Sequence, residues 1–65
     1  MTHIKVFHHT SRDKVFAYTI SNLDAVRVEQ EISFPEISGT VVDIKHTFEY
    51  ITGINMRQIV WITVA

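Results

Sequence analysis

Ile59-Val60-Trp61-Ile62-Thr63-Val64 is the stretch that decides how this chain folds. Its residues are β-branched or aromatic without interruption, which predicts a strand. The run is much shorter than the about 20 apolar residues that cross a bilayer, so we expect no membrane span. Both alternating sides of the run are apolar, and such a strand lies in the middle of a sheet with cover above and below. We therefore expect residues 54–65 to form a central strand.

A β-hairpin is predicted at the other end of the sequence. Residues 4–10 and 14–21 are rich in β-forming residues and flank a short polar segment, residues 11–13. That segment contains no Asn-Gly or Asp-Gly pair, so the turn leaves the register open. Among the possible registers we prefer the pairing of Thr10 with Lys14, because it makes one face of the hairpin clearly more apolar than the other. The more apolar face then carries Ile4, Val6, His8, Phe16, Tyr18 and Ile20.

The middle of the chain predicts a third strand and a helix. Residues 25–34 alternate between apolar and charged side chains, and Pro35 ends this strand because proline has no N–H to donate. Residues 41–52 have apolar side chains at helical spacing, with Thr40 and Gly53 placed as an N-cap and a C′ stop. The apolar positions of this predicted helix, all assigned to the core, are Val41, Ile44, Phe48 and Ile51.

These elements, in the order β-β-β-α-β, predict an α+β fold. It consists of a small four-stranded, mainly antiparallel sheet with one amphipathic helix packed on one face. The helix is long enough for a crossover, which permits the two strands that it joins to run parallel. The 65 residues are expected to form one domain, 1–65, of marginal stability. One helix covers one face of this sheet, so the second face lacks cover within the chain.

Composition and spacing argue against catalysis. The chain has no cysteine, which excludes thiolate metal sites and suits a cytoplasmic location. The predicted elements keep the four histidines too far apart to share a metal ion. No phosphate-binding loop or oxyanion-hole loop is recognisable, so we expect no catalytic residue, no cofactor and no enzymatic activity. The enzymatic alternative is a site between subunits, with His46 and Tyr50, or His8, at the seam.

The uncovered sheet face predicts protein binding. Its largest members are Trp61, Ile59 and Phe7, and aromatic residues are enriched at the centres of interfaces. The function expected from this face is a non-enzymatic protein-binding module, either a homodimer or an inhibitor or adaptor that docks on a larger protein. Its small size is typical of phage- or plasmid-type accessory proteins.

Nucleic acid ranks below protein as an expected partner. The net charge is −1 and the chain has no basic run. The alternative function is a nucleic-acid-binding or regulatory domain that uses the basic N-terminal hairpin. Its candidate contacts are Lys5, Arg12 and Lys14.

Overall fold

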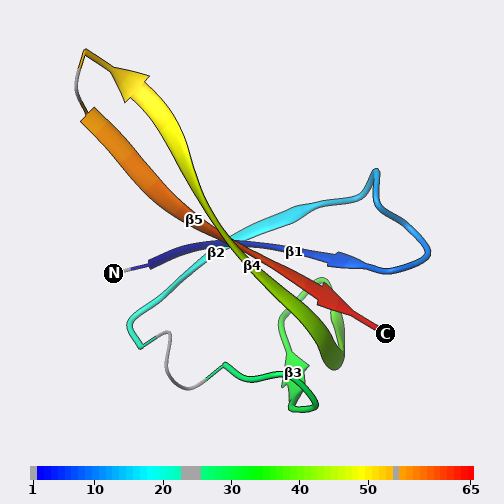
Figure 1. Ribbon diagram of the computed structural model, residues 1–65. Coiled ribbons are helices and arrows are strands. Elements are labelled where there is room, and N and C mark those ends of the chain that lie inside the picture. The colour runs from blue at the N-terminus through cyan, green and yellow to red at the C-terminus, as the bar shows by residue number, and fades with distance from the viewer. Residues whose placement is uncertain (1, 23–25, 54) are drawn as a thin grey trace.

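The computed structural model describes residues 2–22, 26–53 and 55–65, and its strands form one five-stranded mixed sheet (Figure 1). In chain order the strands are β1 (Thr2–His8), β2 (Phe16–Ile20), β3 (Glu31–Ser33), β4 (Ser38–Thr52) and β5 (Asn55–Val64). Their order across the sheet is β2-β1-β5-β4-β3. β1 and β5 run parallel, and the other neighbours run antiparallel. Within the described ranges, no helix is long and apolar enough to cross a membrane.

β5 is the central strand, as its uninterrupted apolar run predicts. It lies between β1 and β4, with Val6 and Ile44 opposite Ile62 on its two sides. Its parallel neighbour is the first strand of the chain, whereas the predicted crossover helix would have permitted the third strand to run parallel to it. The correction follows from the absence of a crossover helix among the described residues, because the chain reaches β5 through the antiparallel β4.

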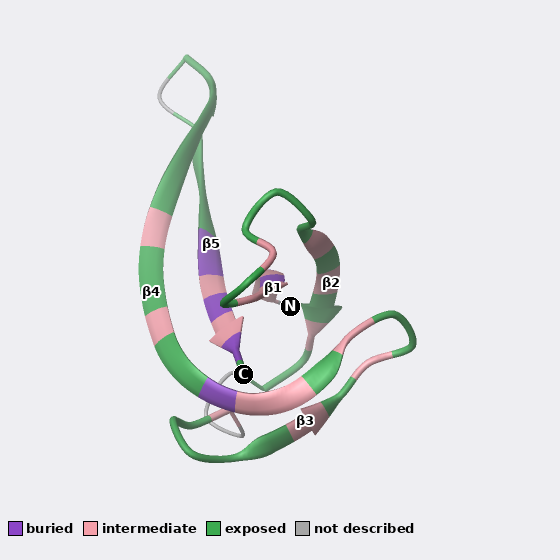
Figure 2. Cartoon of the chain, turned by 90° about the vertical axis from the view of Figure 1, so that its right-hand side faces the viewer, coloured by how far each residue is buried: buried purple, intermediate pink, exposed green. Residues whose placement is uncertain are grey.

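The core lies on one face of the sheet, which we call the inner face, and is built from β1, β4 and β5. The buried residues of this face are Ile4, Val6, Val41, Val60, Ile62 and Val64. Tyr18 on β2 and Phe34, directly after β3, stack with their ring centroids 4.4 Å apart and an interplanar angle of 12°. β2 and β3 are the two edges of the sheet, so this stack brings the edges together around the core. Figure 2 shows β4 curving around the buried segments. The curled sheet thus supplies the cover that the sequence assigned to a helix.

The predicted α+β fold is wrong, because residues 41–52 belong to β4 and the described residues contain no helix. A β-bulge explains the error. Val41 pairs with Val64 and Asp43 pairs with Thr63, which leaves Val42 as the extra residue of β4. A bulge lengthens the two-residue period of a strand to three residues at one step. The inner face therefore recurs at 41, 44, 46 and 48. Because residue 46 is a histidine, the apolar side chains of this face, Val41, Ile44 and Phe48, fall at helical spacing.

The predicted third strand, residues 25–34, is wrong for most of its length. Only Glu31–Ser33 pairs with β4, and residue 25 lies outside the described residues. Before β3 the chain forms a turn, in which the Gln30 N–H donates to the Arg27 carbonyl at 3.2 Å. Glu29 has a φ of 74°, which is incompatible with an extended strand. Alternation of apolar and charged side chains does not reveal such a turn.

The faces of the first hairpin are predicted correctly, although its register is not. Ile4 pairs with Tyr18, whereas pairing Thr10 with Lys14 would have placed Ile4 opposite Ile20. The difference is two residues, and side chains alternate with a period of two, so each residue keeps its face. Tyr18 and Ile20 accordingly pack against the core.

Tyr18 offers a test of this packing. Its hydroxyl oxygen is buried and has no hydrogen-bond partner among the described residues. A buried polar group without a partner costs about 1–3 kcal/mol. We expect Tyr18→Phe to raise the free energy of unfolding by about 1 kcal/mol, because the ring stack with Phe34 is retained. Urea denaturation measures the change, with Tyr50→Phe as the exposed control. A clear loss of stability in Tyr18→Phe would show that the hydroxyl is hydrogen-bonded.

Candidate functional site

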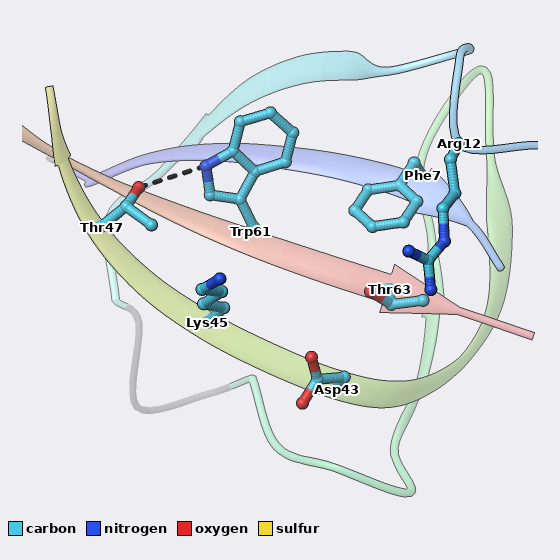
Figure 3. Close-up of a pocket in the computed structure, with 7 residues that line it drawn as sticks. All are labelled: Phe7, Arg12, Asp43, Lys45, Thr47, Trp61 and Thr63. Atoms are coloured by element: carbon cyan, nitrogen blue, oxygen red, sulfur yellow. Dashed lines mark hydrogen bonds between the residues drawn. The ribbon is translucent and has the colours of Figure 1, made fainter.

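An open pocket lies on the outer face of the sheet, the face opposite the core (Figure 3). Its volume is about 360 Å³. We call it the Trp61 pocket. The lining residues are Phe7, Arg12, Asp43, Lys45, Thr47, Trp61 and Thr63.

Strand pairing positions the residues of the pocket. Trp61 on β5 lies between Lys5 on β1 and Lys45 on β4, each directly opposite it. Residues opposite one another on neighbouring strands project from the same face, so these three side chains form a row across the sheet. Phe7 and Thr63, two residues farther along their strands, form the next row. Three segments that are far apart in the sequence thus build one surface.

The Trp61 indole is held by a chain of hydrogen bonds. Its Nε1–H donates to the Thr47 hydroxyl at 3.1 Å, and this hydroxyl donates to the Ile59 carbonyl at 2.9 Å. The Phe7 ring meets the indole edge-on, with the centroids 6.2 Å apart and an interplanar angle of 68°. Together these contacts fix the plane of the indole before any ligand arrives.

Cationic groups surround the two aromatic rings. The Lys5 ammonium lies 5.0 Å from the centroid of the Trp61 ring, within the range of a cation–π interaction. Arg12 reaches over from the loop between β1 and β2, and Lys45 and Asp43 project from β4 (Figure 3). Asp43 is the only acid in the lining. Within the described part of the chain, none of the three cations forms an ion pair. The pocket therefore combines an aromatic surface with unpaired positive charge.

The structure brings together most of the site residues proposed from the sequence. Trp61 and Phe7 lie side by side and are partly exposed, whereas Ile59 is only 3% exposed and contributes packing. Lys5 and Arg12 lie at the pocket, but Lys14 is exposed outside its lining.

Asp43, Lys45 and Thr47 also line this site, although the sequence pattern did not predict them there. All three fall in the predicted helix, where they would not have faced Trp61. Only the pairing of β4 with β5 reveals their position.

A second exposed feature is the arm, residues 47–53 and 55–58, in which β4 and β5 continue beyond the core (Figures 1 and 2). The arm turns at Gly53, whose φ of 57° suits a tight turn, so this glycine is not a helix stop. Phe48 pairs with Gln58 and Tyr50 pairs with Met56, which continues the inner face past the end of the core.

Apolar side chains dominate the inner face of the arm, and we call Phe48, Tyr50 and Met56 the arm face. These side chains are 68%, 66% and 59% exposed. The prediction that Phe48 belongs to the core is therefore wrong. On the opposite side of the arm, Glu49 faces Arg57. The arm is thus a two-sided ribbon with one apolar and one charged side.

Two of the four histidines, His3 and His8, lie on β1, His9 follows this strand directly, and His46 lies on β4. His8 and His9 lie together, with ring centroids 4.6 Å apart, and the Nδ1 atom of His8 is 2.6 Å from the Thr10 hydroxyl. His46 contacts Gln58 on the inner side of the arm, whereas Asp43 lines the outer pocket. Across the described ranges, no three His, Asp or Glu side chains are grouped to hold a metal ion.

The chain matches no protein-family model, no curated protein and no solved structure. Its function is therefore inferred from its own geometry.

Proposed function

We propose that this chain is a non-enzymatic protein-binding module that pairs with a second copy of itself through the arm face. The observation that carries this proposal is the exposure of 59–68% for Phe48, Tyr50 and Met56 on one side of a projecting hairpin. Contiguous apolar surface of this kind marks interaction sites. A two-stranded ribbon is also marginally stable in water unless its apolar side is covered. The arm therefore gains stability from a partner.

The area of the arm face supports a second copy as that partner. A large aromatic side chain buries about 150–250 Å² when it is fully covered, so the arm face, whose three side chains are 59–68% exposed, offers roughly 400–500 Å². In a two-fold symmetric pair each residue contributes twice. The total is then roughly 1,000 Å², which is the area that a specific interface needs.

The two sides of the arm favour the same arrangement. The arm face carries no charged side chain, whereas Glu49 and Arg57 lie on the other side. Two arms that pack with their apolar faces together therefore leave all four charges in water. Charged residues are depleted at the centres of protein interfaces, and this arrangement likewise keeps the charged side chains away from the centre. We also propose a cytoplasmic location, with which the lack of cysteine is compatible.

Phe48→Glu tests the proposal. Because Phe48 is 68% exposed, we expect the variant to keep its sheet, as measured by circular dichroism. A buried charge at the centre of the interface is expected to raise the dissociation constant of the dimer roughly 30-fold or more. Sedimentation velocity over a concentration series measures this change. The wild type is expected near 15 kDa, twice the chain mass of 7.5 kDa.

Val28→Glu is the matched control for this experiment. Val28 is also an exposed apolar residue, at 53%, but it lies in the turn before β3. We expect this variant to remain a dimer. A wild-type chain that stays monomeric at every concentration would contradict the proposal, and so would an unchanged dimer of Phe48→Glu.

A further inference from the structure

We propose that the Trp61 pocket binds single-stranded nucleic acid, with a base on the aromatic rings and phosphates on the surrounding cations. This site lies on the outer face and is separate from the arm face. It also differs from the basic hairpin that the sequence suggests, because it includes Lys45 of β4 and leaves out Lys14.

The aromatic part of the pocket is suited to a base. Thr47 and Phe7 hold the Trp61 indole in place, and the ring is partly exposed on an open sheet face. Unpaired bases stack on aromatic side chains presented in this way, and every base has a π-face. An indole that is already oriented loses little freedom when a base stacks on it.

The distribution of charge is suited to several phosphates. The chain has a net charge of −1, yet three of its six Lys and Arg residues, Lys5, Arg12 and Lys45, lie around Trp61. β5 separates the backbones of Lys5 and Lys45, which places them roughly 10 Å apart. Arg12 reaches the same pocket from the loop between β1 and β2 and lines it together with Thr63 (Figure 3). Cations spread over such a distance favour a chain of anions over a single anion.

The combination of aromatic rings and cations favours one class of anionic polymer over the others. An acidic peptide supplies negative charge but no flat ring for the indole. A double helix keeps its base faces stacked inside and away from protein side chains. A single strand supplies both exposed bases and a phosphate at every nucleotide.

Trp61 is the only tryptophan of the chain, so its fluorescence reports directly on this pocket. The experiment titrates the full chain with an oligothymidylate of about ten nucleotides, within the site sizes of known single-strand binders. A duplex and an oligoglutamate peptide of the same length serve as comparison ligands. We expect saturable quenching by the single strand alone. Three phosphate contacts predict a slope of about −2 for log affinity against log salt concentration.

Substitutions test whether the binding occurs at this pocket. The probe in these measurements is a labelled oligonucleotide, so that Trp61 itself can be replaced. Trp61→Leu is expected to weaken binding about 5- to 150-fold, the effect of losing one stacked base. The double variant Lys5→Gln/Lys45→Gln keeps the indole and is expected to reduce the magnitude of the salt slope by about 1.4. Asp43→Asn is expected to tighten binding, because it removes the one acid from the lining.

Lys14→Gln is the matched control, because Lys14 is an exposed cation of the same hairpin that lies outside the lining. Its affinity is expected to equal that of the wild type. Absence of binding at low salt, equal binding of the duplex or the peptide, or an equal loss in Lys14→Gln would each overturn the proposal. Phe48→Glu is expected to retain binding, so a failure of the arm-face proposal and a failure of this one are distinguishable.

Discussion

Ile62→Ala is expected to lower the free energy of unfolding by about 2–5 kcal/mol, the cost of a cavity in a packed core. Ile62 is fully buried on the central strand, where Val6 and Ile44 face it from the two neighbouring strands. Strand neighbours on both sides hold the backbone in place, so the site cannot collapse to fill the space. A chain of this length has a total stability of about 3–10 kcal/mol. The variant therefore loses a large part of its stability.

Ile51→Ala is the control for this prediction, because it makes the same chemical change at a residue that is 51% exposed. Chemical denaturation at one protein concentration compares both variants with the wild type. We expect a shift of the midpoint for Ile62→Ala and little change for Ile51→Ala. Equal effects of the two substitutions would show that β5 is not the centre of the core.

Gly39→Ala is expected to destabilise the chain by about 2–4 kcal/mol, through steric overlap and backbone strain together. A Cβ atom at Gly39 would lie 2.7 Å from the backbone oxygen of Ala65 and 3.3 Å from the Cβ atom of Val64. The backbone of Ala65 cannot yield easily, because Thr40 and Ala65 exchange two backbone hydrogen bonds of 3.1 and 2.9 Å. The φ of Gly39, 154°, is also rarely adopted by other residues.

Gly53→Ala separates these two causes. Gly53 has a φ of 57°, and a Cβ atom there would meet no described atom within 4 Å. Only backbone strain remains, so we expect a loss of about 1–2 kcal/mol. Thermal unfolding of the two variants measures the difference. If Gly39→Ala were no worse than Gly53→Ala, the close approach of β4 to Ala65 would be contradicted.

The sequence singled out two residues that line the candidate site, Trp61 and Phe7, as interface residues, and the lining residues that it missed have one cause. Trp61 and Phe7 were identified because large aromatic side chains on an uncovered face are conspicuous in any strand pattern. Lys45 and Thr47 were missed because the segment containing them was assigned to a helix. The same assignment placed Phe48 in the core, although it is 68% exposed on the arm.

The sequence by itself determined that residues 59–64 belong to a central strand and which faces of the first hairpin point to the core. The run from Ile59 to Val64 is apolar on both sides, and the faces of the first hairpin follow from alternation, because both patterns are local. Tertiary structure alone decided that β1 runs parallel to β5 and that Tyr18 stacks on Phe34 across the two sheet edges. It also decided that residues 41–52 are a strand. The bulge at Val42 is stabilised by pairing with β5, and a local pattern shifted by one residue cannot be distinguished from a helix without that partner.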